Sequence, residues 1–414
     1  MSNNCRILYV SYNGLLEEIV PSQVVPYLRE LTKRGYRFTL LTFEKKEKLN
    51  AVGKNGVKKL KNELKQIGVD WHWLRYHKRA PLFATSFDVL VGTVYVLFLV
   101  ITGKIDIIHA RSIVPAAMSL VAKLFGAKFI FDTRGLLAEE YVGGGHWKEG
   151  ELKYRIVKFF EKFCLKLADT IVVLTQQHYK YLLNLSWLKN KSRDLPIEVI
   201  PCCVDLSRFR YDFPRANMIK GKENMQDNFI FTYLGKIGKH YMFKEMIDFV
   251  KDALGILPNA KFMILTQSDK QMVLDIASNN DIDHSKLIIK KPTFDEIPSL
   301  VSTASAGIFF INPYKKFGSS PIKLGEFLSC GIPVIINSGI GDTEGLVKEN
   351  RVGAVVGGFD KTSYTSAFCE LLGLMKEGES LSKRCRKTVE DHLSLDLGVR
   401  KYSSVYERVQ GCTP

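Results

Sequence analysis

Short apolar runs recur along the first half of the chain, and longer segments of mixed polarity separate them. The runs cover residues 7–10, 38–42, 105–109, 128–132 and 170–174, and each has the length of a buried strand. A predicted helix, residues 22–34, follows the first run and ends before Gly35. This alternation predicts βαβ units in a doubly wound parallel sheet, where ligands bind at the carboxyl ends of the strands.

The second half repeats the same rhythm after a break. Residues 205–228 are charged, contain Pro214 and Gly221, and lack a sustained apolar period, which indicates a linker. Further strand-like runs cover residues 229–234, 261–265, 287–289, 307–310, 334–336 and 354–356. The pattern predicts an α/β protein with two Rossmann-like domains, residues 1–208 and 209–390. A helix over 397–409 is expected in the last segment, 391–414.

One segment, residues 89–101, is strongly apolar, with Asp88 before it and Lys104 after it. It is shorter than the roughly 20 residues that a membrane-spanning helix needs. Two interpretations stay open. The segment can be a core helix of the first domain. Alternatively, residues 82–103 can insert into one leaflet, with the upstream bases Arg75, Lys78 and Arg79 on lipid phosphates.

Composition supports a globular protein whose two halves differ in charge. The chain has 414 residues, of which 46% are hydrophobic, so two domains are expected. Residues 1–200 contain 31 Lys and Arg against 18 Asp and Glu, a net of +13, out of +16 for the whole chain. A basic half favours an anionic partner, either nucleic acid or an acidic membrane. No nucleic-acid-binding signature occurs, so we expect no nucleic acid and favour the membrane over a merely soluble basic surface.

The eight cysteines include no C-x-x-C pair, and no histidine cluster accompanies them. A zinc site or a disulfide framework is therefore not expected, and a reducing compartment is favoured. Residues 1–6 lead directly into the first strand without a signal peptide. We expect a cytoplasmic protein that can lie peripherally on the cytoplasmic face of a membrane.

The segment GSSPIKLGEFLSCGIPVI, residues 318–335, reads as a loop, a helix and a strand. Ser320 suits the N-cap, Pro321 the first helical turn, and Gly331 the C-cap. Lys323 and Glu326 are three residues apart and share a face near the helix N-terminus, where a phosphate is favoured. A cation beside a carboxylate is typical of nucleotide binding. An ordinary capped helix explains the spacing equally well.

This segment resembles the donor-site signature of the retaining, GT-B-fold glycosyltransferases of family 4, in the branch that often builds surface polysaccharides. Other segments resemble motifs of the same family in the same order: PSQVVPYL (21–28), HARS (109–112), FDTRG (131–135), VVLT (172–175), IPCCVD (200–205) and YLGK (233–236). The set covers nearly the whole chain. The resemblance implies the GT-B fold, with a cleft between the domains and a last helix that crosses back to the first domain.

The resemblance also implies an activity. A sugar would pass from a nucleotide-diphospho-sugar, bound by the second domain, to a glycan or polyprenyl-diphosphate-linked acceptor, with retention of configuration. The nucleotide-sugar is then a substrate, and neither a cofactor nor an essential metal is expected. The sequence contains no Walker loop, and no G-x-G-x-x-G follows the first strand, which argues against an NAD-dependent dehydrogenase.

On the donor side, the resemblance assigns contacts to Gly235, Lys236, Lys239, Gly318, Ser319, Ser320, Pro321, Ile322, Lys323 and Glu326. Glu326 would bind the ribose hydroxyls, and Lys323 would neutralise the departing diphosphate. Lys236 matches a basic position of the family, whereas His240 replaces the second lysine and leaves Lys239 as a neighbour. Gly318 stands where the family usually has a glutamate that contacts the sugar, so Ser319 and Ser320 become candidate donors to it.

On the acceptor side, His109 and Arg111 end one strand, and Asp132 and Arg134 end the next. The family frequently has a histidine where this chain has Arg111, which cannot act as a base and is expected to bind phosphate. Asp132, Glu139 or Glu140 is a candidate to orient or deprotonate the acceptor hydroxyl. A structural pair of Asp132 and Arg134 is an equal alternative. Catalytic roles are expected for Lys323, Lys236, Arg111, Asp132 and Arg134.

Two rivals stay open. The first is a GT-B enzyme of different chemistry, such as a nucleotide-sugar epimerase or a sugar phosphorylase. The second is a scaffold that binds nucleotide-sugar without catalysis.

Overall fold

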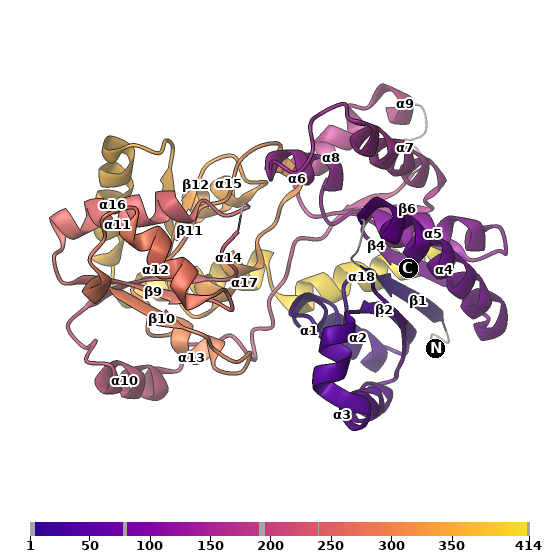
Figure 1. The fold of residues 1–414 in the computed structure, drawn as a ribbon, viewed down its shortest axis with the longest axis horizontal. Helices are drawn as coiled ribbons and strands as arrows, with labels where there is room; N and C mark the ends of the chain where they lie inside the picture. Colours follow the sequence, from indigo (N-terminus) through magenta and orange to yellow (C-terminus); the bar gives the residue numbers. More distant parts are fainter. Residues whose placement is uncertain (1–4, 78–80, 190–194, 239, 412–414) are drawn as a thin grey trace. The chain divides into compact units, whose positions relative to one another are not determined.

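The computed structural model describes residues 5–77, 81–189, 195–238 and 240–411, and its chain forms two compact units (Figure 1). The first unit contains the chain up to Val142, then Trp147–Pro201, and finally the chain from Gly398 onward. The second unit contains Gly143–His146 and Cys202–Leu397. The division after Pro201 precedes the predicted boundary at residue 208.

The first unit is built on a parallel sheet of seven strands in the order β3-β2-β1-β4-β5-β6-β7. The strands are β1 (Arg6–Ser11), β2 (Arg37–Glu44), β3 (Val69–Arg75), β4 (Ile107–Arg111), β5 (Lys128–Asp132), β6 (Thr170–Val173) and β7 (Ile197–Val199). The register pairs Ser11 with Arg111 and Arg111 with Asp132. The polar residues at the ends of β4 and β5 therefore lie side by side at the carboxyl edge, next to the point where the strand order reverses.

Helices cover this sheet, and their bounds are α1 (Ile19–Gln23), α2 (Val25–Lys33), α3 (Lys46–Gln66), α4 (Pro81–Gly103), α5 (Ile113–Lys123), α6 (Leu137–Gly143), α7 (Leu152–Leu167), α8 (Gln176–Leu183), α9 (Ser186–Lys189) and α18 (Leu395–Gln410). The predicted helix over 22–34 is confirmed as α2 over residues 25–33, but its start is wrong, because Val24 leaves helical geometry (φ −120°) and separates α1 from α2. From Gly398 onward, α18 packs by its tyrosines: Tyr402 lies against Tyr27 and Tyr406 against Tyr36.

The second unit has a parallel sheet of six strands in the order β10-β9-β8-β11-β12-β13. The strands are β8 (Phe229–Leu234), β9 (Ala260–Leu265), β10 (Leu287–Lys290), β11 (Ala306–Phe309), β12 (Val334–Asn337) and β13 (Gly353–Val356), which confirms the six predicted runs. The strand order reverses between β8 and β11, so the segments that follow these strands flank the expected ligand crevice of this sheet.

The helices of the second unit are α10 (Phe213–Lys222), α11 (Phe243–Ile256), α12 (Lys270–Ser278), α13 (Ile297–Val301), α14 (Ile322–Ser329), α15 (Thr343–Asn350), α16 (Lys361–Met375) and α17 (Glu379–His392), with 3₁₀ turns η1 (His284–Lys286) and η2 (Lys316–Gly318). The interpretation of residues 205–228 as a linker is wrong in part, because α10 occupies its middle. Asp212 caps α10 by accepting a hydrogen bond from the Arg215 N–H, and Pro214 lies in the first turn.

The apolar segment around residue 95 belongs to a longer helix than its sequence predicted. Within α4, Phe83–Gly103 has a mean hydropathy of 2.0 and is long and apolar enough to cross a membrane, by length and composition alone. The prediction that the segment is too short is therefore wrong. Val96, Leu99 and Val100 are buried in the core, whereas the opposite face of the helix is exposed.

Candidate functional site

The donor segment of the second unit forms α14, but its start differs from the prediction. The helix begins at Ile322, and Pro321 is the N-cap residue in extended geometry, so Ser320 is not the cap. The Ser320 hydroxyl instead accepts a hydrogen bond from the Cys202 N–H at 3.1 Å. Gly331 follows the C-cap Cys330 with φ 74°, a left-handed conformation that glycine adopts easily.

Lys323 lies in the first turn of α14 with its ammonium group in an aromatic setting. Its side chain is buried, and among the described residues Nζ has no hydrogen-bond partner. The ammonium lies 3.7 Å from the ring centroid of Tyr241 and 4.7 Å from that of Tyr233. Cation–π attraction holds the charge in place, yet it leaves the three N–H donors for a ligand.

Gly235 follows β8 and lies directly beside this ammonium. Its φ is 135°, which disfavours any residue with a side chain, and its N–H donates to the Leu265 carbonyl. A Cβ at this position would lie 2.9 Å from Lys323 Nζ. The glycine therefore keeps open the space in front of the ammonium, as close approach to a phosphate requires.

Glu326, one turn further along α14, is a buried carboxyl group with incomplete charge compensation. Burial raises its pKa to about 7, against the opposing effects of Lys323 and Arg208. The Glu326 carboxyl group therefore changes its ionisation near neutral pH rather than in the usual acidic range. A carboxylate in this state gains from any ligand that donates hydrogen bonds to it, as vicinal hydroxyl groups do.

Arg208 belongs to this constellation, although the sequence analysis missed it. Its guanidinium lies 3.0 Å from the ring centroid of Phe294 and donates to the Phe294 carbonyl, while burial lowers its pKa. Its charge acts on Glu326. The residues next to Arg208 in the sequence do not predict its role, because its hydrogen-bond partner Phe294 is 86 residues away. The only indication in the sequence is that Arg208 lies close to the IPCCVD segment.

The remaining predicted donor residues lie around the same strand ends. The Lys236 side chain is exposed, and its carbonyl accepts a hydrogen bond from the Tyr233 hydroxyl at 2.6 Å. Gly318 ends η2 and is buried, and Ser319 connects it to Ser320. Lys239 lies outside the described residues.

The loop after β12 packs against the segment that leads to η2. The Gly341 N–H donates to the Lys316 carbonyl at 3.0 Å, and a Cβ on Gly339 would lie 3.1 Å from Pro313. These contacts fix the loop beside the residues that lead into α14.

In the first unit, Asp132 is the centre of a buried polar network. Its Oδ2 accepts a hydrogen bond from the Tyr402 hydroxyl at 3.0 Å and lies 3.4 Å from His109 Nε2 and 3.5 Å from Arg134 Nη1. The other ring nitrogen of His109 lies 2.8 Å from the Tyr406 hydroxyl. Two residues of α18 thus complete a site whose other members end β4 and β5.

The charges in this network are well defined. Burial alone would raise the pKa of Asp132, but Arg134, His109 and Arg111 outweigh burial and hold it below the ordinary value. Burial lowers the pKa of His109, although Asp132 opposes the shift. Asp132 is therefore ionised and His109 neutral near pH 7, and the carboxylate is best suited to position its neighbours.

Arg111 and Arg134 converge on one acceptor. Arg111 Nη2 and Arg134 Nη2 donate to the same oxygen, Gln23 Oε1, at 2.9 and 3.2 Å. Arg134 has a φ of 56°, a left-handed conformation that is uncommon for arginine. The two guanidinium groups converge on an uncharged amide, and the Asp132 carboxylate offsets part of their charge, so the group keeps a net positive charge that suits a phosphate.

The two glutamates on α6 have separate surroundings. Glu139 is buried and forms an ion pair with Lys158 of α7 at 3.0 Å, and its Oε1 accepts a hydrogen bond from the Tyr154 hydroxyl. Glu140 lies over Gly135, where a Cβ would come within 2.8 Å of Oε1. Glu140 thus lies beside Gly135, the residue that follows Arg134, whereas Glu139 faces the helix layer.

Metal ligands do not gather in the part of the chain that the structure describes: no group of three or more His, Cys, Asp and Glu side chains is arranged to hold a metal ion. An Asp-x-Asp triplet occurs at Asp281 to Asp283, but Asp283 caps η1 by accepting hydrogen bonds from the Ser285 N–H and hydroxyl group. The expectation of metal independence stays a prediction.

One family model matches part of the chain. Residues 23–208 match the family model described as Glycosyltransferase Family 4. A search of curated proteins gives no match.

Solved structures resemble the chain over nearly its full length. Sucrose-phosphate synthase from Thermosynechococcus elongatus has a TM-score of 0.72 at 15% identity, covering 99% of this chain and 100% of its own. A glycosyltransferase from Rickettsia africae has a TM-score of 0.71 at 17% identity, with the same coverage. Anabaena HepE in complex with UDP-glucose has a TM-score of 0.69 at 11% identity, covering 97% of this chain and 99% of its own. With the two parallel sheets, these likenesses show the GT-B fold.

Proposed function

We propose that this protein is a glycosyltransferase that takes a sugar from a nucleotide-diphospho-sugar bound in its second unit. The observation that carries the proposal is the pair on α14: the buried Lys323 ammonium, which lacks a hydrogen-bond partner among the described residues, and the Glu326 carboxyl group with its pKa raised to about 7. The match of residues 23–208 and the shared fold support the same class. Because HepE has been solved with UDP and UDP-glucose, a uridine diphosphate sugar is the first donor to test.

Each donor-side residue has a role that follows from its surroundings. Lys323 neutralises the diphosphate as the bond to the sugar breaks, since its N–H donors are free for a ligand. Glu326 accepts hydrogen bonds from the ribose hydroxyls, with Arg208 holding its charge. Gly235 admits the phosphate, and Lys236 adds positive charge from the exposed side of the same turn.

The acceptor side of the proposal rests on the first unit. Arg111 and Arg134 bind a phosphate, either of the donor or of a polyprenyl-diphosphate-linked acceptor. Asp132 positions Arg134, and His109 is held as a neutral group beside them. Transfer then proceeds with retention and without a metal, and the protein contributes orientation and charge stabilisation.

A thermal-shift screen of the full chain against UDP, GDP, ADP, CMP and their sugar conjugates tests the donor site. We expect one nucleotide to raise the unfolding temperature, because a ligand that binds only the native state stabilises it. Glu326→Ala should abolish the shift, whereas Glu370→Ala, which removes an exposed glutamate on α16, should preserve it. A shift that survives in Glu326→Ala would contradict the donor assignment.

Turnover separates transfer from the rival activities. The nucleotide-sugar that gives a shift is incubated with extracted lipid or glycan acceptors, and labelled product is measured. Hydrolysis or epimerisation of the donor without any acceptor would favour a different GT-B chemistry. Binding without turnover on any acceptor would favour a non-catalytic scaffold.

A further inference from the structure

The exposed face of α4 carries a continuous stripe of large apolar side chains. Phe83, Phe87, Leu90, Val94, Phe98 and Ile101 each expose between 52% and 79% of their surface. Their spacing of three and four residues keeps them on one side of the helix. In a soluble protein such a stripe normally packs against another element, so its exposure calls for a covering partner.

Exposed apolar residues also occur on two further helices of the first unit. α5 packs between α4 and α7, and Figure 1 shows the three helices along one side of the first unit. Exposed apolar residues on or next to α5 and α7 are Val121, Leu124, Phe125, Leu152, Phe159, Phe160 and Phe163. Each of these helices leads into a following parallel strand, so their carboxyl ends meet at the same edge of the sheet. We call the exposed faces of α4, α5 and α7 the three-helix surface.

α4 is fixed to the rest of the first unit in spite of its apolar character. The buried Asp88 carboxylate accepts a hydrogen bond from the Tyr12 hydroxyl at 2.8 Å and lies 2.6 Å from His77 Nδ1. Gly92 lies so close to Met118 of α5 that a Cβ would come within 2.6 Å of its sulfur atom. Displacing α4 from this position would break the contacts of Asp88 with Tyr12 and His77 and would expose the sheet. The helix is therefore long enough to span a bilayer but is held in the fold on one side.

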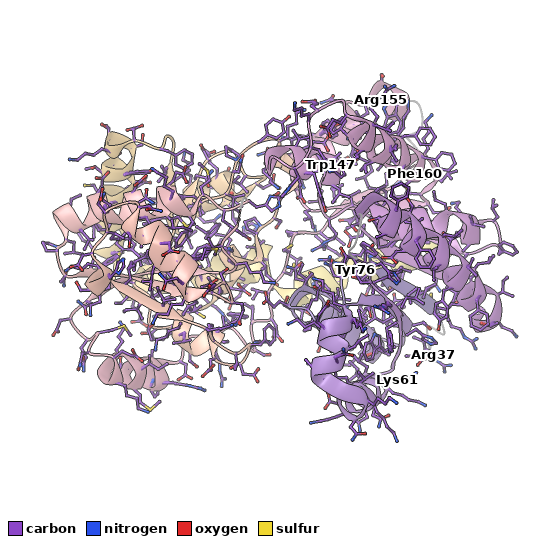
Figure 2. The ribbon with its side chains drawn as sticks, viewed as in Figure 1. Arg37, Lys61, Tyr76, Trp147, Arg155 and Phe160 are labelled. Carbon is purple, nitrogen blue, oxygen red and sulfur yellow. The ribbon has the colours of Figure 1, made fainter. Side chains whose placement is uncertain are left out.

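The charges on and around the surface identify its partner. On α7 the exposed charged residues are all basic: Lys153, Arg155, Lys162 and Lys166. The acid of this helix, Glu161, is buried and paired with Lys158. Figure 2 labels Arg155 and Phe160, which both belong to α7. Protein–protein interfaces are depleted in lysine, whereas aromatic residues interleaved with lysine and arginine suit the headgroup region of an acidic membrane.

We propose that the three-helix surface docks on an anionic lipid bilayer, with α4 lying in the plane of the interface. The apolar stripe enters the boundary between headgroups and acyl chains, and the basic residues of α7 bind lipid phosphates. This inference goes beyond sugar transfer and does not depend on it, because membrane binding is measured without a donor.

Flotation of the full chain with vesicles tests the apolar part of the surface. Vesicles of phosphatidylcholine alone are compared with vesicles that contain about three parts in ten of phosphatidylglycerol. The variant Phe87→Ser/Leu90→Ser/Val94→Ser should bind the acidic vesicles at least about tenfold more weakly, because it removes three buried apolar groups from the lipid. Its matched control is Met218→Ser/Ile256→Ser/Phe359→Ser, which replaces three exposed apolar residues of the second unit and should bind like the wild type.

A second pair of variants tests the charges. Lys153→Ala/Arg155→Ala/Lys162→Ala on α7 should weaken binding to acidic vesicles at least about tenfold. The control Lys54→Ala/Lys58→Ala/Lys61→Ala removes the same net charge from the exposed, strongly basic α3 and should weaken binding much less. Wild-type binding should also fall as salt rises. Circular dichroism of each variant establishes that it is folded.

Three results would overturn the proposal. Equal binding to neutral and acidic vesicles would remove the role of charge. An α3 control that loses as much binding as the α7 variant would place the contact elsewhere. Retention of the protein in membranes washed with alkaline carbonate would mean that α4 spans the bilayer. Thermal shifts with nucleotides report the donor site separately, so a failure here leaves the proposed activity intact.

Discussion

Replacing Glu326 by glutamine should make the second unit more stable at alkaline pH while it weakens donor binding. The side chain is buried on α14, and the positive charges of Lys323 and Arg208 do not fully offset the loss of hydration. Glutamine has almost the same shape and cannot ionise. The substitution therefore removes a buried charge without creating a cavity.

The size and the sign follow from the pKa. Burial raises the pKa of Glu326 from 4.5 to about 7, so the folded chain holds a proton that the unfolded chain has released. Stability is therefore lost as pH rises from about 4.5 to 7, up to a limit of about 3 kcal/mol for a shift of this size. Between pH 5 and pH 8, the advantage of Glu326→Gln over the wild type should grow by about 2–3 kcal/mol.

The distribution of tryptophans lets the two units be followed separately. All four, Trp71, Trp73, Trp147 and Trp187, belong to the first unit, so their fluorescence reports that unit, whereas far-UV circular dichroism reports both. Urea unfolding of both proteins at pH 5 and pH 8 should show a pH-dependent gain in the dichroism transition alone. An advantage that is the same at both pH values would refute the inference that Glu326 carries an uncompensated charge.

Four further predictions address the site. Lys323→Met should raise the dissociation constant of the donor nucleotide at least about tenfold, measured by calorimetry, because it removes the ammonium donors proposed to bind the diphosphate. Gly235→Ala should destabilise the second unit by about 1–3 kcal/mol and weaken the same binding, since its φ is 135° and its Cβ would displace the Lys323 ammonium. Asp132→Asn should destabilise the first unit by about 3–5 kcal/mol at pH 7, measured by tryptophan fluorescence during unfolding. Because the fold lowers the pKa of Asp132, its contribution to stability is present above pH 3.8, the ordinary pKa, and is lost as the pH falls below that value. Treatment with EDTA should leave sugar transfer unchanged, and a loss that added Mg²⁺ restores would contradict metal independence.

Local patterns predict most of the two sheets, because a buried parallel strand needs a short run of apolar residues on both faces. Five of the six strands of the second unit are of this kind, and β10, at the edge of the sheet, is half-buried but still apolar over Leu287–Ile289. β3 was not predicted, since its burial alternates: Val69 and Trp71 are buried, while Asp70 and Arg75 are exposed. β7 has only three residues and lies at the sheet edge, where little burial marks it.

The contacts of the candidate site are also of two kinds. Some are set by spacing along one helix, and others join residues that are far apart in the sequence. The spacing of Lys323 and Glu326 on one helix face is a local property, and the structure places both on α14 near the end of β8. The aromatic rings around Lys323 and the charge of Arg208 come from segments that only the folded sheet brings together. Sequence spacing carries no information about such contacts, so a motif identifies the helix but not the environment that sets its charges.

Asp132 and Glu326 are both buried, but the fold stabilises the charge of Asp132 and destabilises that of Glu326. This difference distinguishes a residue that positions its neighbours from one that is suited to bind a ligand. Asp132 meets a tyrosine hydroxyl, a histidine and two arginines, so the fold itself stabilises its charge. Glu326 keeps a raised pKa although Lys323 is three residues away, because the lysine ammonium lies against aromatic rings and donates no hydrogen bond to it among the described residues. A group that is destabilised by its own fold gains most from a partner that supplies the missing hydrogen bonds. For Glu326 that partner must donate hydrogen bonds, and for Lys323 it must accept them. A ribose joined to a diphosphate meets both requirements in one molecule, which is why the proposed donor fits this pair better than a sugar or a phosphate alone.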